Sequence, residues 1–348
     1  MTLLTRTITF AAAMGFASIA SAETLSLTHP SPPGSASGVA LQAWAQELSD
    51  ATDGELQIEF YWQQSLSRLG DNLEAVSSGL ADIGLIVPAY HRQQMPLAYL
   101  SSTATGSGDP YVISRAWNET RNSFPAFQQE EESLNLQYLA VESIGSVQLI
   151  GNRHYITPDD FQNATMRLAS HYAFAAQDSG WNVNPARVQA PETYMTLERG
   201  TITGAATYAD QILPFRLNEV TDYLTLMGLG QHSNMYYMNR DRWNGLSEAH
   251  RDAIAASLPA LNLAFAQAQI EEAAGVFDTI ASDPVYPVEI RALTEEERAV
   301  WAEALAPSYE HNVSRAASVN AQAPEIADAY MALIDSTAER VAAEGYPW

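Results

Sequence analysis

One arginine stands among apolar residues in the middle of this chain. Arg167 lies in the run Met166-Arg167-Leu168-Ala169. A guanidinium removed from water is costly unless it is paired, and its planar fork fits a carboxylate through two parallel hydrogen bonds. The partner could be an Asp or Glu of the protein or the carboxylate of a bound ligand. Chemistry alone favours the first, because structural ion pairs also perturb charged groups and are common.

The sequence carries none of the common catalytic motifs. It has no G-x-S-x-G, no H-E-x-x-H, no Walker A and no G-x-G-x-x-G after a strand. Its seven histidines are scattered and it has no cysteine, so we expect neither a metal cluster nor a thiol nucleophile. We predict a protein that is not an enzyme and uses no cofactor and no metal. A secreted α/β hydrolase with an unrecognised carboxylate pair is kept as an alternative.

The elements that must position Arg167 follow from the local pattern. Segment 158–204 is predicted to form a turn, a short strand carrying Arg167, a helix, a second strand, and a helix closed by Gly200. Nearer the N-terminus, apolar strand patterns alternate with helical ones from residue 25 to residue 87. This alternation predicts a mostly parallel sheet with helices on both faces. Ligands bind beyond the carboxyl ends of such strands, where His29 and Tyr90 lie.

Two motifs in the central segment resemble the signature of TRAP-transporter solute-binding proteins, the DctP-like extracytoplasmic receptors for organic acids. The first is PDDFQNATMR at 158–167, beside the family pattern P-x-D-x-x-G-x-K-I-R. The second is ETYMTLERGTITG at 192–204, beside E-V-Y-x-A-L-Q-x-G-x-x-D-G. In that family the arginine of the first motif binds the ligand carboxylate, and Arg167 stands in its place. The resemblance extends over nearly all of the chain after residue 22.

The resemblance implies an α/β protein with the two-domain periplasmic binding protein fold. Crossing strands, a hinge and a long helix that spans both domains would join the two parts, and the domains would close over the ligand. The first domain would hold 23–144 with about 232–272. The second would hold 145–231 with about 273–348 and the C-terminal helices. Each domain is then discontinuous in sequence.

The resemblance also implies a ligand site between the domains. The family commonly has asparagine where this chain has Thr207, whose hydroxyl can still donate one hydrogen bond to a carboxylate. Some members carry a second arginine about twenty residues before the main one, where Val147 stands here. We therefore expect one ligand carboxylate held by Arg167, in a monocarboxylate or a zwitterion rather than a dicarboxylate. Further wall residues, predicted from strand ends and the helix face beside the cleft, are Tyr90, Gln211, Asn234, Tyr236 and His29.

The N-terminus predicts export. Residues 1–22 resemble a secretory signal, with Arg6 before an apolar stretch and Ala20-Ser21-Ala22 as the cleavage site. Without cysteine there is no lipid-anchored residue and no disulfide, so we expect a periplasmic protein. The net charge is −24 at pH 7, which argues against nucleic acid as a partner.

The function predicted from these features is that of a solute receptor. As a monomer, it would bind a small organic acid and deliver it to the membrane permease of a TRAP transporter. The same binding fold also serves receptors that signal to a membrane kinase, and the sequence alone does not separate these two roles.

Overall fold

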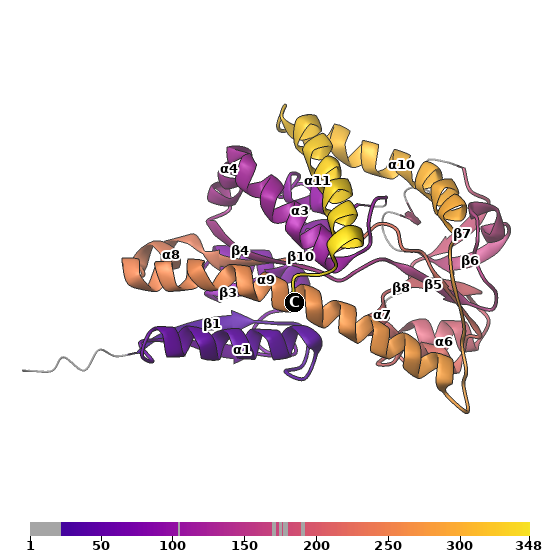
Figure 1. Cartoon of the computed structure of the whole chain (residues 1–348), viewed down its shortest axis with the longest axis horizontal. Helices are drawn as coiled ribbons and strands as arrows, with labels where there is room; N and C mark the ends of the chain where they lie inside the picture. The colour runs from indigo at the N-terminus through magenta and orange to yellow at the C-terminus, as the bar shows by residue number, and fades with distance from the viewer. Residues whose placement is uncertain (1–21, 104, 169–171, 174–175, 177–179, 189–191) are drawn as a thin grey trace, which may run out of the picture.

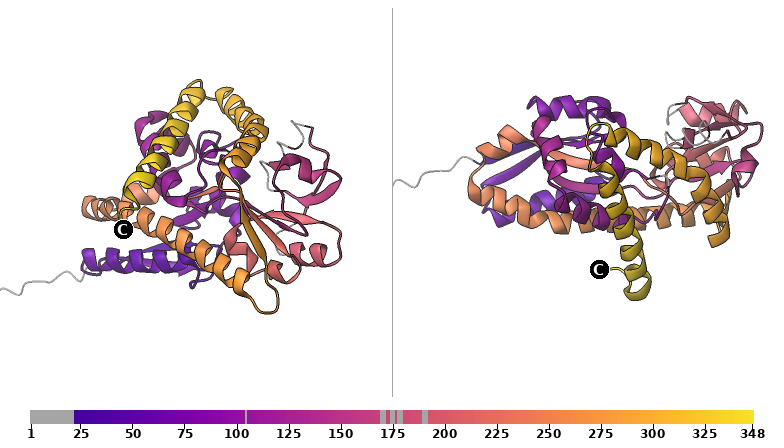
Figure 2. Two further views of the ribbon diagram at one scale, coloured as in Figure 1. Left: turned by 45° about the vertical axis from the view of Figure 1, so that its right-hand side comes forward. Right: turned by 90° about the horizontal axis from the view of Figure 1, so that it is seen from above.

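The computed structural model describes residues 22–348 with the exception of short internal stretches, at 104, 169–171, 174–175, 177–179 and 189–191. The signal peptide expected at 1–22 lies outside the described residues, apart from Ala22. The described chain forms two α/β lobes, each built around its own sheet (Figure 1). Both views of Figure 2 show the second lobe, in pink, set apart from the indigo and purple first lobe.

The first sheet has five strands in the order β2-β1-β3-β10-β4. Its strands are β1 (Glu23–Thr28), β2 (Leu56–Tyr61), β3 (Ile83–Ile86), β4 (Leu136–Ser143) and β10 (Ser233–Asn239). β1 runs parallel to β2 and β3, and β10 runs antiparallel to β3 and β4. β1, β3 and β4 therefore end at one edge of the sheet. The predicted β-α-β alternation is present in this lobe, with α1 (Ala36–Ala51) and α2 (Asn72–Ser77) between the first three strands.

Helices cover both faces of this sheet, as the alternation of its strand residues requires. On β10, Met235 and Tyr237 pack into one hydrophobic cluster with Trp117 of α3 (Pro110–Ser123). Tyr236 and Met238 point the other way, into a second cluster that includes Trp44 and Phe265. This period of two is the strand geometry itself. Further helices of this lobe are α4 (Pro125–Ser133) and α8 (Arg240–Gly245), with short 3-10 turns η1 (Leu69–Asp71), η2 (Pro88–Tyr90) and η3 (Ala98–Ser101).

The second sheet has six strands in the order β11-β9-β5-β8-β6-β7. Its strands are β5 (Gln148–Gly151), β6 (Ala164–Arg167), β7 (Val183–Ala186), β8 (Gly204–Thr207), β9 (Tyr223–Leu226) and β11 (Glu289–Ala292). β6 runs parallel to β7 and β8, with Arg167 level with Ala205. Arg167 and Thr207 therefore end neighbouring strands at the same edge. The connecting elements are η4 (Pro158–Phe161), α6 (Thr193–Glu198), α7 (Ala209–Ile212) and η6 (Leu217–Glu219).

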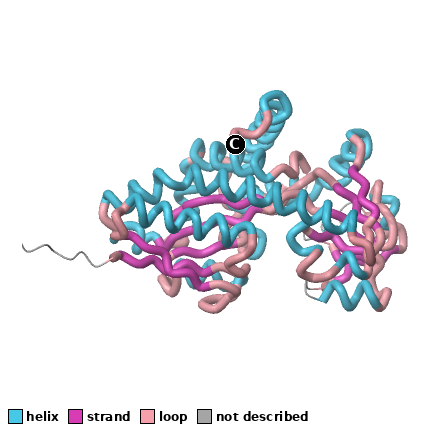
Figure 3. Tube along the Cα trace, turned by 60° about the horizontal axis from the view of Figure 1, so that its bottom comes forward, coloured by secondary structure: helices cyan, strands magenta, loops and turns pink. Residues whose placement is uncertain are grey.

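One long helix runs along both lobes. α9 (Glu248–Ser282) packs against α1, α3 and β4 of the first lobe and against α7 and β11 of the second. Figure 3 shows it crossing from one group of strands to the other. By length and composition alone α9 could also cross a membrane, but here it packs along the two sheets. The predicted domain-spanning helix is confirmed.

The last helix packs against a different lobe from the one expected. We placed 273–348 with the second domain. Trp301 in α10 (Glu295–Ala317) does lie in a hydrophobic cluster of the second lobe. Tyr330 of α11 (Ala323–Glu344), however, lies in the first lobe's cluster beside α3. The physical reason is length, since 23 helical residues span about 35 Å, enough to cross between lobes. The other domain boundaries stay predictions.

Candidate ligand-binding site between the two sheets

The carboxyl edges of the two sheets face each other. Arg167 and Thr207 end strands of the second sheet, while Tyr90 lies in η2, just after β3 of the first. The phenol of Tyr90 is close enough to contribute to the pKa of both Arg167 and Tyr208. Side chains from both lobes therefore meet near Arg167, in the position where parallel sheets bind ligands.

Arg167 is partly buried and hydrogen-bonds to backbone carbonyls. Its Nε donates to the carbonyl of Val188 at 3.1 Å, and its Nη1 donates to the carbonyl of Ala206 at 2.6 Å. Burial lowers the pKa of Arg167 below its ordinary value. Within the described part of the chain, no carboxylate lies within ion-pair distance of this guanidinium. Carbonyl partners orient a guanidinium but do not neutralise it, so the charge is left for an external anion.

The predicted wall residues nearest Arg167 differ in exposure. Tyr90 is 61% exposed, whereas Thr207 is only 1% exposed. The Thr207 hydroxyl donates to Oε1 of Gln211 at 3.4 Å, so these two predicted residues are brought together. Asn234 hydrogen-bonds to His232, whose ring lies 6.4 Å from that of Tyr208. The ligand-binding roles of all four predicted residues stay predictions.

His29 and Tyr236 are brought together inside the first lobe. Each is 1% exposed, and His29 Nε2 lies 3.0 Å from the Tyr236 hydroxyl. Tyr236 in turn donates to Oε2 of Glu142 at 3.1 Å. Both side chains are therefore buried behind Glu142, and their ligand-binding roles stay predictions.

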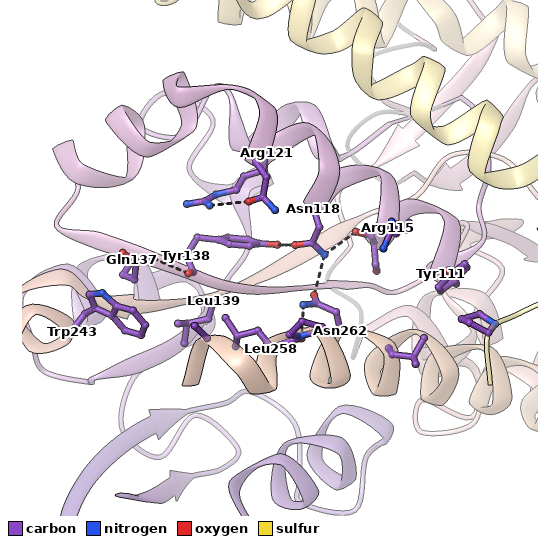
Figure 4. Close-up of a pocket in the computed structure, with 16 residues that line it drawn as sticks. Tyr111, Arg115, Asn118, Arg121, Gln137, Tyr138, Leu139, Trp243, Leu258 and Asn262 are labelled. Carbon is purple, nitrogen blue, oxygen red and sulfur yellow. Dashed lines mark hydrogen bonds between the residues drawn. The ribbon is translucent and has the colours of Figure 1, made fainter. Parts of the chain in front are cut away.

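Two cavities accompany this arrangement. One of about 850 Å³ lies beside Arg167, lined by its neighbour Leu168, by Val188 and Trp181, and by Arg92 of the first lobe. The other, of about 610 Å³, lies between α3, β4 and α9 in the first lobe (Figure 4). There the Tyr138 hydroxyl donates to Oδ1 of Asn118 at 2.9 Å, and Nδ2 of Asn118 donates to Oδ1 of Asn262 at 3.3 Å. None of the predicted site residues lines this second cavity, and its polar groups bind one another.

Fold and site together define the class of protein. Two sheet-centred lobes, crossing connections and a spanning helix form the two-domain periplasmic binding protein fold. The chain also belongs to a named family, the bacterial extracellular solute-binding proteins, family 7 (DctP), which it matches over residues 27–315. The resemblance to TRAP solute-binding proteins is thereby confirmed. This family consists of binding proteins, not enzymes, so the hydrolase alternative has no support.

Individual relatives are similar to this chain in sequence or in fold. The C4-dicarboxylate-binding periplasmic protein DctP of Rhodobacter capsulatus is 23% identical over 283 residues, covering 78% of this chain and 80% of the relative. A TRAP periplasmic solute-binding protein from Desulfovibrio salexigens, solved in an open complex, superposes with a TM-score of 0.81 at 17% identity, covering 93% and 98% of the two chains. One from Bordetella bronchiseptica, solved with bound mandelate, gives a TM-score of 0.76 at 19% identity, covering 90% and 99%.

Several charged and aromatic residues at these edges were missed from sequence. Tyr208 lies beside Arg167, and Glu142, Asp210 and Glu272 come close together between the lobes. One signal was available: Glu142 is the single charged residue of the strand LQYLAVES, next to its carboxyl end. Like Arg167, Glu142 is a charge in an apolar strand and needs a partner. Asp210 and Glu272 carry no such signal.

Proposed function

We propose that this protein is an extracytoplasmic receptor that binds a small organic acid through Arg167, between its two lobes. The observation that carries the proposal is the environment of the Arg167 guanidinium. It is partly buried, it is oriented by two carbonyls, and no carboxylate of the described chain pairs with it. A ligand carboxylate would supply that charge in the bidentate geometry that Arg favours. The relatives named for dicarboxylate and mandelate binding support this class of ligand.

The delivery step follows from family membership. We propose that the receptor works in the periplasm, as a monomer, and hands its ligand to a TRAP membrane permease. The N-terminal signal predicted at 1–22 would bring it there and be removed. Co-purification with the permease encoded beside it would support this pairing, and a neighbouring membrane kinase in place of a permease would favour the sensing role instead.

Domain closure is the expected mechanism. Closing two lobes over a ligand expels water, which strengthens each charge interaction inside. Small-angle scattering should show a smaller radius of gyration with a bound acid than without it. An unchanged radius in the presence of saturating ligand would contradict closure.

A thermal-shift screen tests the ligand class. Because a ligand that binds only the folded state raises apparent stability, organic acids should raise the melting temperature of the wild-type protein. Neutral sugars and simple amines serve as matched negative sets. If sugars or amines shift the melting temperature and carboxylates do not, the assignment of Arg167 to a ligand carboxylate is wrong.

A further inference from the structure

Three carboxylates lie on the spanning helix α9 and on two elements that pack against it. Glu142 ends β4 of the first lobe, Asp210 lies in α7 of the second, and Glu272 lies on the spanning helix α9. After burial, the charges of Glu272 and Glu142 are the main causes that raise the pKa of Asp210, to about 7. We call these three residues the acidic cluster. It joins both lobes and the helix between them.

Glu142 is held in place by neutral donors. It is 1% exposed and accepts hydrogen bonds from Ser37, from Gln269 at 2.7 Å and from Tyr236 at 3.1 Å. Behind Tyr236, the Ser31 N–H donates to Nδ1 of His29 at 3.1 Å, so the ring proton lies on Nε2 and is donated to the Tyr236 hydroxyl. Burial raises the pKa of Glu142 more than these hydrogen bonds lower it. Every group in this hydrogen-bond chain donates toward the carboxylate and so stabilises its ionised form against the cost of burial.

Asp210 supplies the observation that points to a ligand. Its Oδ1 is shielded from solvent and makes no hydrogen bond with any described residue. A buried polar atom left without a partner is costly, so most such atoms are satisfied in a functional state. Glu272 lies one helical turn beyond Gln269, on the face of α9 that bonds Glu142. The cluster thus presents one orphaned acceptor beside two further carboxylates.

No protein cation neutralises the acidic cluster within the described residues. None of the ion pairs of the described chain includes Glu142, Asp210 or Glu272. The described residues also contain no group of metal-ligating side chains arranged to hold a metal ion. Carboxylates without metal geometry suit a larger, non-coordinating cation such as an ammonium group, which brings its own N–H donors.

Tyr208 connects this cluster to Arg167. The charges of both Asp210 and Arg167 contribute to its pKa, in opposite directions. One aromatic side chain therefore lies near both the cationic and the anionic group. A positive site and a negative site near one ring match a small molecule that carries both charges.

We propose that the acidic cluster binds the cationic nitrogen of the ligand whose carboxylate Arg167 holds, so that the receptor selects zwitterions. This inference rests on the proposed function, which places the ligand carboxylate at Arg167, and it adds a binding site for the other end of the ligand. It replaces the open choice between a monocarboxylate and a zwitterion with the zwitterion. The nitrogen satisfies Oδ1 of Asp210 and lowers the repulsion among the three carboxylates, which also favours closure of the lobes.

Matched ligand pairs test this inference, because the members of each pair differ only in the charge of one atom or group. Suitable pairs, in which the cationic nitrogen carries N–H donors, are proline with cyclopentanecarboxylate and γ-aminobutyrate with valerate. Dissociation constants are measured by calorimetry at pH 8. In each pair that binds, the zwitterion should bind about tenfold or more tightly than its neutral-tailed partner, the scale of a close charge pair.

Substitutions then test whether the acidic cluster causes the preference for the zwitterion. Asp210→Asn should abolish the preference for the zwitterion while leaving its neutral-tailed partner, cyclopentanecarboxylate or valerate, bound. Glu339→Gln, on an exposed face of α11, also removes one negative charge and should leave the preference for the zwitterion unchanged. Without ligand, Asp210→Asn should melt at the same temperature as the wild type or higher, because it removes repulsion. A lower melting temperature would show that the carboxylate has a structural partner, and would overturn the inference.

The outcomes separate this inference from the proposed function. If the two members of each pair bind equally, or the neutral-tailed acid binds more tightly, the zwitterion inference fails and the carboxylate receptor stands. An unchanged preference in Asp210→Asn has the same consequence. If the panel yields ligands only among cations that lack a carboxylate, the proposed function fails and the inference falls with it.

Discussion

Two arginines of this protein are buried to a similar degree and have opposite surroundings. Arg121 of α3 donates from Nε and Nη2 to the two oxygens of Glu131, at 3.1 and 2.5 Å, and its guanidinium lies 4.8 Å from the centre of the Tyr138 ring. Burial lowers its pKa, but the hydrogen bonds and charge of Glu131 outweigh burial and raise it. For Arg167, burial lowers the pKa and no carboxylate of the described chain offsets it.

The contrast separates a structural arginine from a ligand-binding one. Arg167 lies in an apolar run, whereas Arg121 is flanked by Thr120 and Asn122, and neither pattern tells whether the partner is an internal carboxylate or a ligand. What differs is the geometry around the head group: a buried glutamate from α4 meets Arg121, whereas carbonyls meet Arg167. Removing Arg121 should therefore cost stability, and removing Arg167 should cost binding.

The largest expected effect on stability is that of Arg121→Ala. It leaves Glu131, 4% exposed, as an uncompensated buried charge, which should lower the unfolding free energy by about 3–5 kcal/mol. Urea denaturation measures this. Arg115→Ala is the matched control in the same helix, because its pair with Glu119 is exposed and worth about 0.3–0.5 kcal/mol. Equal losses in the two variants would contradict the assignment of Arg121.

A second prediction uses Glu130, the neighbour of Glu131, which has no arginine partner among the described residues. Its oxygens accept from the N–H groups of Leu97 and Ala98 at 2.8 and 2.9 Å. Burial, opposed by these hydrogen bonds, raises the pKa of Glu130 from 4.5 to about 7. Because the folded-state pKa lies above the unfolded-state value, the folded protein holds this proton more tightly. Its contribution to stability is complete below pH 4.5 and is lost as pH rises through 7.

Glu130→Gln should flatten that pH dependence. Between pH 4.5 and 7, the wild type should lose roughly 1–3 kcal/mol more unfolding free energy than the variant. Denaturation series at several pH values measure the difference between the two proteins, which cancels the titration of the histidines and of Asp210. Parallel curves would show that Glu130 does not change its protonation in this pH range, and would contradict its raised pKa.

The smallest expected effect concerns Thr207, at the Arg167 edge. Thr207→Val keeps the shape of the side chain and removes one hydroxyl donor, so ligand affinity should fall by about 0.5–1.5 kcal/mol, the worth of one hydrogen bond. Calorimetry with the best acid from the screen measures it. An unchanged affinity would mean that the hydroxyl serves only Gln211, to which it donates at 3.4 Å.

The sequence could predict the fold because its signals are local. The β-α-β alternation before residue 87, the spanning helix, and the placement of Arg167 at a strand end each depend on a short segment whose pattern decides the outcome. Gly200 illustrates this, since its φ of +66° is the left-handed conformation that a glycine after a helix adopts at little cost. Motif resemblance added the family and the expected role of one residue.

The acidic cluster could not be predicted because it depends on packing between distant segments. Glu142, Asp210 and Glu272 come from three elements more than sixty residues apart, and only the juxtaposition of the lobes brings them together. In a chain with 41 acidic residues, an aspartate or glutamate on a helix is usually a solvated one. The position of α11 likewise depends on distant packing, because its apolar face does not tell which lobe will cover it.

The most direct test of the account is a calorimetric titration of Arg167→Ala with an acid that binds the wild type, alongside a denaturation curve of the same preparation. Arg340→Ala, on the exposed surface of α11, is the matched control for the loss of one positive charge. We predict that Arg167→Ala unfolds within about 1.5 kcal/mol of the wild type, since it loses only carbonyl hydrogen bonds. Its affinity should be lower by about 2–5 kcal/mol, roughly 30-fold or more, while Arg340→Ala binds normally. A folded Arg167→Ala that binds the acid as tightly as the wild type would contradict the account.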